Sequence, residues 1–523
     1  MSWGGEIPLY DARMQKIRVA EVLAALSLTT DVAAGMSFEK GLRMCAVATT
    51  FADAVLGVDS VTRRVVFEAA LLRSVGCTSF APELAEVFGD DIAFQTALKR
   101  LDHGDEAVFA TQMRTFGDWA GDDRPRLAQT FIDVFPTMGV EAMRSGCETS
   151  RALGTGLGLL PDSVAALDDV YERWDGRGIP DGCRGTQLSQ AARIVHVAEQ
   201  AVLAHDLGGA PAAVAEVRRR SGGHLDPDLA RAFVADASVA LAPLEQPNAL
   251  AAVLDLEPVP HVTVPFASLP QLCAVLARVV DLKSRWLLGH SEHVATLAAD
   301  AGALAGLDPA AVAELRCAAL VHDLGRVGIP TSVWDSPSQL GIAEVERVRM
   351  HTYWTHRILE RIPALASLAP IASAHHERVE GGGYHRGDPS GSLPFAARIL
   401  AAADVFAALT EPRAHREAFT VQAAADVLVH EADTGGLDRE ACAAVLGAAG
   451  LPRPRRVLPA GLTERETEVL CLAARGMSNR QIGERLSISS RTVGHHLAHI
   501  YDKTGRRSRA GVAVFAMEHR LLP

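Results

Sequence analysis

Apolar residues recur every three or four positions along most of the chain. In one stretch they fall at Val294, Leu297, Ala298, Ala301 and Leu304. This spacing places them on one face of an α-helix. Sustained alternation of apolar and polar residues, which is typical of half-buried strands, is scarce. The pattern therefore predicts an all-α protein.

Length and composition limit the possible architectures. With 523 residues, of which 48% are hydrophobic, the chain is long enough for three or four domains with large helical cores. Aromatic residues make up only 5%, which speaks against β-sandwiches. There is no uncharged run of about 18 residues and no charged-then-apolar leader, so we expect a cytoplasmic protein without a membrane partner. The eight cysteines stand singly, which fits a reducing compartment.

Histidine and aspartate residues gather between residues 290 and 404. Imidazole and carboxylate groups together bind divalent first-row metals. A carboxylate between two imidazole clusters can bridge a pair of ions that share one activated water. The order of these residues therefore predicts a two-metal site. Its candidate ligands are His290, His322, Asp323, His351, His375, His376 and Asp404.

The segments around these ligands resemble the HD superfamily of phosphohydrolases, and within it the HD-GYP branch, which hydrolyses the bacterial second messenger cyclic di-GMP. The resemblance covers about residues 289–419 and is strongest at Val321-His322-Asp323-Leu324-Gly325-Arg326. It implies that the seven residues are metal ligands and that Asp323 bridges a divalent pair such as Fe or Mn. It also implies that Arg326 holds the scissile phosphate, so Asp323 and Arg326 are the expected catalytic residues.

Two positions depart from the pattern of that family. Arg326 stands where the family usually has Lys, although a guanidinium still offers a charged fork for phosphate. The substrate-side loop, usually Trp-Asp-Gly-x-Gly-Tyr-Pro, reads Val-Glu-Gly-Gly-Gly-Tyr-His over residues 379–385. The aromatic plate and the rigid proline are lost, so cyclic di-GMP as the ligand rests on the resemblance alone.

The first part of the chain repeats the second in degenerate form. A gap-free alignment places Gly41 under His290 and Arg73-Ser74 under His322-Asp323. Further on, Glu199 lies under Asp404, and about 44 extra residues separate the two sets of matches. The first part also keeps Trp-Asp-Gly-Arg-Gly-Ile-Pro at residues 174–180, a better copy of the family loop.

We therefore expect a degenerate HD-GYP-like domain without metal ligands at residues 1–245 and a metal-dependent HD-GYP-like domain at residues 246–452. The alternative is a pair of unrelated helical domains that share an Ala, Leu and Val composition.

A basic, proline-interrupted linker is expected at residues 453–457, followed by a compact helical module at residues 458–523. Thr463 and Glu466 have the spacing of a capping box at a helix start. Ser478 caps a second helix, and residues 487–489 form the turn before a third at about residues 491–501. A short helix, a tight turn and a helix with a polar outer face predict a helix-turn-helix, whose second helix enters the DNA major groove.

This module resembles the LuxR-type DNA-binding domain over about 60 residues, with Leu-Thr-Glu-Arg-Glu at residues 462–466 and Thr492-Val493 among the matching positions. That family commonly has Lys where this chain has Gly494. The resemblance implies double-stranded DNA as a partner and binding as a homodimer. The candidate phosphate contacts are Arg491, Lys503, Arg506 and Arg507, and the candidate base contacts are Thr492, Val493, His495 and His496.

The C-terminal segment carries a net positive charge, as DNA binding requires. From Arg453 onward, 13 basic residues face 6 acidic ones, so this segment carries +7 and the rest of the chain −19. A basic end on an acidic body fits a protein that meets the phosphate backbone only at that end.

Three functions remain open from the sequence. The first is a bacterial transcriptional regulator whose HD-GYP-like domain binds or hydrolyses a phosphorylated ligand such as cyclic di-GMP. The second is a metal-dependent cyclic dinucleotide phosphodiesterase that the helix-turn-helix only recruits. The third is a ligand sensor that uses its metal as a clamp without turnover.

Overall fold

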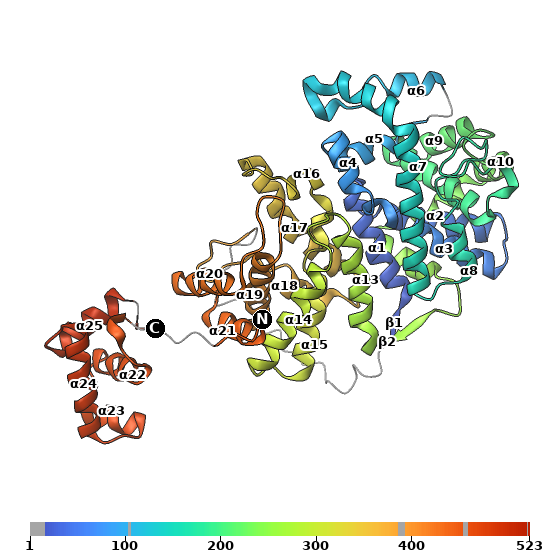
Figure 1. The fold of residues 1–523 in the computed structure, drawn as a ribbon. Coiled ribbons are helices and arrows are strands. Elements are labelled where there is room, and N and C mark those ends of the chain that lie inside the picture. The colour runs from blue at the N-terminus through green and yellow to red at the C-terminus, as the bar shows by residue number, and fades with distance from the viewer. Residues whose placement is uncertain (1–15, 103–105, 385–392, 453–458, 520, 523) are drawn as a thin grey trace. The chain divides into compact units, whose positions relative to one another are not determined.

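The computed structural model describes residues 16–102, 106–384, 393–452, 459–519 and 521–522. The regular secondary structure of this part is helical apart from one pair of three-residue strands, so the predicted all-α class is confirmed (Figure 1). The chain forms two compact units, residues 1–451 and 452–523. The predicted linker at 453–457 lies outside the described residues. None of the described helices has the length and apolarity needed to cross a membrane.

The first unit consists of two successive helical halves. The first half contains β1 (Lys16–Arg18), α1 (Val19–Ala33), α2 (Lys40–Thr50), α3 (Ser60–Leu72), the 3-10 helix η3 (Val75–Thr78), α4 (Ala81–Phe88), α5 (Asp91–Leu98), α6 (Glu106–Gln112), α7 (Arg124–Gly156), α8 (Pro161–Ala166), α9 (Gln190–Arg220), α10 (Pro227–Ala235), α11 (Ala237–Leu241) and α12 (Ala249–Leu256). The second half contains β2 (Thr263–Pro265), α13 (Leu269–Asp281), α14 (His290–Leu304), α15 (Pro309–Leu320), the 3-10 helix η8 (Leu324–Gly328), α16 (Thr331–Trp334), α17 (Ile342–Arg361), α18 (Ala369–Ala372), α19 (Phe395–Thr410), α20 (Val421–Thr434) and α21 (Arg439–Ala448).

The two halves repeat the same local landmarks. α2 and α14 each begin after a residue in the left-handed conformation, Glu39 and Gly289. α3 and α15 each follow an N-cap aspartate, Asp59 and Asp308, whose side chain accepts hydrogen bonds from amides of the first turn. This order supports the predicted repeat over two unrelated helical domains.

The structure changes one position of the gap-free alignment. α2 begins at Lys40 as α14 begins at His290, so Lys40, and not Gly41, is the equivalent of His290. Between these helix starts and the following aspartate caps, the first half has one residue more than the second. A π-helical turn at Phe51–Val55, directly after α2, takes up this residue, because a π turn holds more residues than an α turn.

The halves pack against each other through equivalent elements. α1 of the first half packs on η8 of the second, and α13 of the second packs on η3 of the first. β1 and β2 pair antiparallel, with Ile17 opposite Val264. One hydrophobic core runs through both halves. α12 packs on α2, so the boundary predicted at residue 245 separates α12 from its partner; we propose a division after α12 instead.

The extra residues of the first half are helical, as the sequence predicts. They include α5, α6 and the start of α7, and they surround a separate aromatic core that includes Phe88, Phe94 and Phe131. Asp91, the first residue of α5, reaches the second half: its carboxylate lies 2.5 Å from Lys283 Nζ and accepts a 2.7 Å hydrogen bond from the Thr331 amide. The insert therefore holds the two halves together through contacts of Asp91 with Lys283 and Thr331.

The second unit is a four-helix module comprising α22 (Glu464–Ala474), α23 (Asn479–Leu486), α24 (Ser490–Thr504) and α25 (Arg509–Glu518). The predicted capping box is present: Thr463 N donates to Glu466 Oε2 at 2.7 Å, and Glu466 N donates to Thr463 Oγ1 at 3.2 Å. Ser478 caps α23 as predicted. α24 extends beyond residues 491–501 at both ends.

Replacing Gly494 by alanine is expected to stabilise the second unit by about 1 kcal/mol, because glycine costs this much in a helix interior. Gly494 lies within α24, and a Cβ built there would meet only Asn479 Nδ2, at 3.9 Å. Chemical denaturation of the parent and the variant measures the difference. An unchanged or lower unfolding free energy would show that the glycine serves packing in α24.

Candidate metal centre and DNA-contact surface

The seven predicted ligands come from five segments of the second half and lie together in its interior. His290 begins α14, His351 lies in α17 and Asp404 lies in α19. The other four occupy loops that directly follow α15 and α18. Six of the seven side chains are buried, and His376 is half-buried.

Asp323 stands between two groups of histidines. Its Oδ2 lies 3.1 Å from His322 Nε2 and 3.8 Å from His290 Nε2. Its Oδ1 lies 3.5 Å from His375 Nε2 and 3.6 Å from His351 Nε2. Each carboxylate oxygen therefore faces a different imidazole pair, as a bridging ligand requires.

Asp404 and His376 complete the two groups. Asp404 Oδ1 lies 3.3 Å from His290 Nε2 and 3.7 Å from His322 Nε2. His376 groups with His351 and His375, so that each has a ring nitrogen within 4.8 Å of the others.

Backbone carbonyls fix the orientation of three imidazoles. The Nδ1 atoms of His322, His351 and His375 lie 2.6, 2.5 and 2.7 Å from the carbonyl oxygens three residues earlier in the chain. When Nδ1 donates its proton to a carbonyl, Nε2 is left with a lone pair for a metal. All three Nε2 atoms point toward Asp323.

The centre contains buried polar atoms that the protein itself does not satisfy. His290 Nε2, His322 Nε2, Asp404 Oδ1 and both carboxylate oxygens of Asp323 form no hydrogen bond among the described residues, although Asp323 Oδ2 forms an ion pair with Arg326. Burying a polar atom without a hydrogen bond costs free energy, and a cation bound to the lone pairs of these atoms would offset that cost. The donor set, nitrogen and carboxylate oxygen, fits divalent first-row metals.

The electrostatics also favour positive charge. Burial favours the neutral form of His322, but the Asp323 and Asp404 carboxylates outweigh burial and raise its pKa to about 10. Burial lowers the pKa of His351, which faces one carboxylate, to about 3. A negative field strong enough to hold a proton on a buried imidazole also stabilises a divalent cation.

Arg326 lies at the edge of the centre, as predicted. Its Nε is 2.7 Å from Asp323 Oδ2, and its guanidinium carbon stacks 4.5 Å from the centre of the Trp334 ring. Both residues line a groove of about 230 Å³ together with Trp286 and Arg413. Trp334, Trp286 and Arg413 were not predicted, because they lie outside the ligand motifs and only the fold brings them here.

Glu411 is a further residue at the centre that the sequence did not predict. One of its carboxylate oxygens lies 2.8 Å from His290 Nδ1 and the other 2.8 Å from His293 Nδ1. Despite burial, these two imidazoles hold the pKa of Glu411 at about 2. Glu411 directly follows the last family-like segment, and an acidic residue at that place was the available signal.

The substrate-side loop is described as far as Tyr384, and His385 lies outside the described residues. The Tyr384 ring lies 4.4 Å from the His376 ring, and the Arg349 guanidinium is 5.6 Å from the Tyr384 ring. An aromatic group therefore stands at the candidate metal centre although the family's tryptophan is absent from the loop.

The first half holds an ion cluster at the equivalent place. Glu199, aligned with Asp404, lies 2.9 Å from Lys40 Nζ through one oxygen and pairs with Arg73 through the other. Among the described residues, every group of side chains able to hold a metal lies in the second half.

The second unit exposes most of the predicted DNA contacts. Arg491, Thr492, His495 and Arg507 are exposed, while His496 and Arg506 are half-buried. Val493 is fully buried with Leu497 and Ile500, so its proposed contact with a base edge is wrong and its role is in the core.

Lys503 and Arg506 are engaged within the unit. Lys503 Nζ lies 2.6 Å from Glu466 Oε2 and donates to the Gly461 carbonyl at 2.9 Å. Arg506 pairs with Glu518 at 2.8 Å. Lys503 thus ties α24 to the capping box of α22, which makes it a structural residue as well as a candidate phosphate contact.

Two family models match the chain. The HD domain model matches residues 274–441, and the model of bacterial regulatory proteins, luxR family, matches residues 460–516.

Curated relatives come from the phosphodiesterases of cyclic dinucleotides. The 3'3'-cGAMP-specific phosphodiesterase 3 of Vibrio cholerae is 26% identical over 443 residues, which cover 83% of this chain and 95% of the relative. The 3'3'-cGAMP-specific phosphodiesterase 1 of the same organism is 31% identical over 169 residues, 32% of this chain and 39% of the relative. The cyclic di-GMP phosphodiesterase of Thermotoga maritima is 36% identical over 129 residues, 24% of this chain and 35% of the relative.

A solved structure shares the fold. The crystal structure of a cyclic GMP-AMP specific phosphodiesterase from V. cholerae covers 84% of this chain and 99% of its own, with a TM-score of 0.59 at 22% identity. The chain therefore combines an HD domain, in the second half of its first unit, with a C-terminal domain of the bacterial luxR regulatory family.

Proposed function

We propose that this protein is a DNA-binding transcriptional regulator whose second half hydrolyses a cyclic dinucleotide at a pair of divalent metal ions. The position of Asp323 carries this proposal, since its two oxygens face two separate imidazole groups. The proposed ligands are those predicted from the sequence: His290, His322, Asp323, His351, His375, His376 and Asp404.

The metal pair would supply an activated water and neutralise charge on the phosphate. The chain would supply the rest. Trp286 and Trp334 offer flat aromatic surfaces in the groove beside the metal centre, and Arg326 and Arg413 offer positive charge for a phosphate. This combination of aromatic surface and guanidinium suits a substrate that carries bases and phosphodiesters together.

The substrate class rests on the relatives. One relative acts on 3'3'-cGAMP by its name and another on cyclic di-GMP. Their common feature is a cyclic dinucleotide. The loop at residues 379–383 differs from the family pattern, so we propose the class without choosing a base combination.

Incubation of the full chain, loaded with Mn²⁺ or Fe²⁺, with 3'3'-cGAMP and with cyclic di-GMP tests the enzyme. We expect linear dinucleotide product from at least one of them, and its loss with a chelator. A metal-loaded protein that hydrolyses neither would overturn the enzymatic part.

A ligand sensor without turnover is the second candidate. It is favoured by the 2.7 Å ion pair between Arg326 and Asp323, which engages the proposed phosphate-binding group with the proposed bridging ligand. Tight binding of a cyclic dinucleotide to the metal-loaded protein, without product, would establish this function instead.

The DNA-binding part rests on α23 and α24. Their junction at Ser487, with a φ of +54°, makes the tight turn of a helix-turn-helix, and the exposed face of α24 begins with Arg491 and Thr492. We propose binding as a homodimer, because two recognition helices are needed for a site of useful length. Val514 and Met517 on α25, 42% and 61% exposed, are available for self-association, whereas Val512 and Phe515 of the same helix are in the core.

Replacing Arg491 by alanine is expected to weaken binding to all DNA sequences and to lower the salt slope by roughly one unit, because one phosphate contact releases about one counterion. Replacing the exposed His495 is expected to change the preference between sequences instead. Fluorescence anisotropy against genomic fragments at several salt concentrations measures both effects.

Arg439→Ala serves as the control, since Arg439 is a half-exposed arginine of α21 outside the second unit. It removes one positive charge and should leave the slope unchanged. Salt-independent binding by the parent, or no binding at low salt, would show that the module acts only in recruitment of the enzyme.

A further inference from the structure

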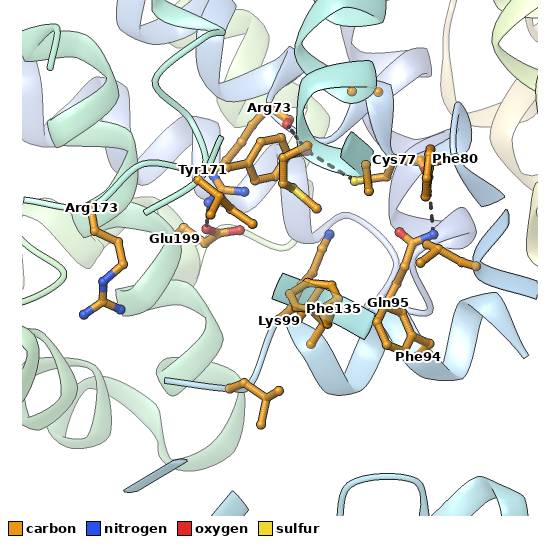
Figure 2. Close-up of a pocket in the computed structure, with 18 of the residues that line it drawn as sticks. Arg73, Cys77, Phe80, Phe94, Gln95, Lys99, Phe135, Tyr171, Arg173 and Glu199 are labelled. Atoms are coloured by element: carbon orange, nitrogen blue, oxygen red, sulfur yellow. Dashed lines mark hydrogen bonds and ion pairs between the residues drawn. The ribbon is translucent and has the colours of Figure 1, made fainter. Parts of the chain in front are cut away.

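The first half contains a cavity of about 160 Å³ between α5, α7 and the ion cluster of Arg73 and Glu199 (Figure 2). It lies at the place that the metal centre occupies in the second half. Arg73 stands at the position of His322, and Glu199 at that of Asp404. The side chains that replace the proposed metal ligands in the first half leave a cavity at this position of the fold.

One wall of the cavity is apolar. It is formed by Phe80, Leu84, Phe94, Leu98, Phe135 and Met143. An apolar cavity of about 150 Å³ holds a benzene molecule, so this space suits a single aromatic ring or a short aliphatic chain. A cyclic dinucleotide exceeds this volume.

The opposite wall carries excess positive charge. Glu199 is the acceptor for both Lys40 and Arg73. Arg173 pairs with Asp102 at 3.0 Å. Most of the cationic lining is thus already paired within the protein.

Lys99 is different. It donates one 3.4 Å hydrogen bond to Ser74 Oγ and forms no ion pair with a carboxylate in the described part of the chain. Figure 2 shows its side chain entering the cavity from the end of α5, on the side toward Tyr171 and Arg73. Burial lowers the pKa of its ammonium group, so an anion beside it would be stabilising.

The cavity adjoins a wider groove through which a ligand could enter. Lys99, Leu101, Gln200 and Arg220 line both this cavity and a wider groove of about 1160 Å³ on the same half.

We propose that the cavity is a binding site for a small aromatic or short-chain aliphatic carboxylate, with the carboxylate on Lys99 and the apolar body against Phe94 and Phe135. The site lies on the insert that reaches the second half through Asp91, eight positions before Lys99 in the chain. A bound ligand would therefore contact the end of the same segment that braces the metal-bearing half.

Isothermal titration calorimetry with the full chain tests the site, using benzoate and its uncharged isostere benzamide as probes. We expect benzoate to bind at least about 10-fold more tightly than benzamide, because an ion pair in a low-dielectric cavity exceeds a neutral hydrogen bond. Lys99→Met should remove this preference and leave benzamide binding unchanged. Lys99→Arg, which keeps the charge, should retain it.

Arg126→Met is the matched control, because Arg126 lies on the same insert with a 73% exposed side chain. Met143→Trp, which fills the cavity, should abolish binding of both probes, and it tests the site independently if Lys99→Met does not fold. Absence of benzoate binding, equal affinities for the two probes, or unchanged benzoate binding in the folded Lys99→Met or Met143→Trp variant would overturn the proposal. Each readout is binding and does not depend on hydrolysis by the second half.

Discussion

Replacing Asp323 by asparagine is expected to remove most of the bound metal and to lower cyclic dinucleotide hydrolysis by at least about 10³-fold. A change in a residue that only supports a ligand costs 10–100-fold in metal affinity, and loss of a bridging ligand should exceed this. The two oxygens of Asp323 face two separate pairs of proposed metal-binding imidazoles. Asparagine keeps the shape but not the charge. Elemental analysis of the purified variant gives the metal content, and product formation gives the rate.

Asp300→Asn is the control for this experiment. Asp300 lies on α14, the helix that begins at His290, but its side chain is exposed to solvent. This change should affect neither metal content nor rate. Full metal occupancy in the Asp323 variant would contradict the proposed bridging role.

Replacing Gly325 by alanine is expected to destabilise the first unit by about 3 kcal/mol, the upper end of the usual cost of overpacking. η8 approaches α17 so closely here that a Cβ on Gly325 would lie 1.9 Å from the His351 carbonyl oxygen and 2.7 Å from the Thr355 amide nitrogen. Both atoms belong to the backbone, so the two segments would have to separate. His351 is a proposed ligand, and the variant should also hold less metal.

Denaturant unfolding and elemental analysis measure these two effects. Gly156→Ala is the control, because a Cβ at Gly156 meets nothing within 4 Å. Equal stability of Gly325→Ala and the parent would mean that the contact between η8 and α17 yields easily. Gly76 makes the same kind of approach in the first half, where a Cβ would lie 2.1 Å from the Gly146 carbonyl oxygen.

Much of the fold could be predicted because it depends on local patterns. The 3.6-residue period fixed the helical class, and side-chain caps such as Thr463 and Ser478 marked helix starts correctly. The gathering of the ligands could be predicted from their motifs. The equivalence of Lys40 with His290 could not be predicted, because the composition of residues 51–55 does not indicate a π turn.

The surroundings of the site depend on tertiary structure and were therefore missed. Trp286 reaches the groove from the turn between α13 and α14, and Trp334 reaches it from the end of α16; neither lies at a motif spacing. Val493 was placed both in the core and at a base edge, and only the packing of α24 shows that the core holds it. Lys99 lies in the insert, which has no motif, and its proximity to Arg73 arises from folding alone.

The buried ion pair between Asp91 of the first half and Lys283 of the second couples the stability of the two halves. Their side chains are 0% and 1% exposed, so each charge relies on the other. Replacing Asp91 by alanine would leave Lys283 buried without its counter-ion, at a cost of about 3–5 kcal/mol. The first half therefore supplies the counter-ion on which a buried charge of the second half depends. This dependence gives a physical reason for the chain to retain both halves.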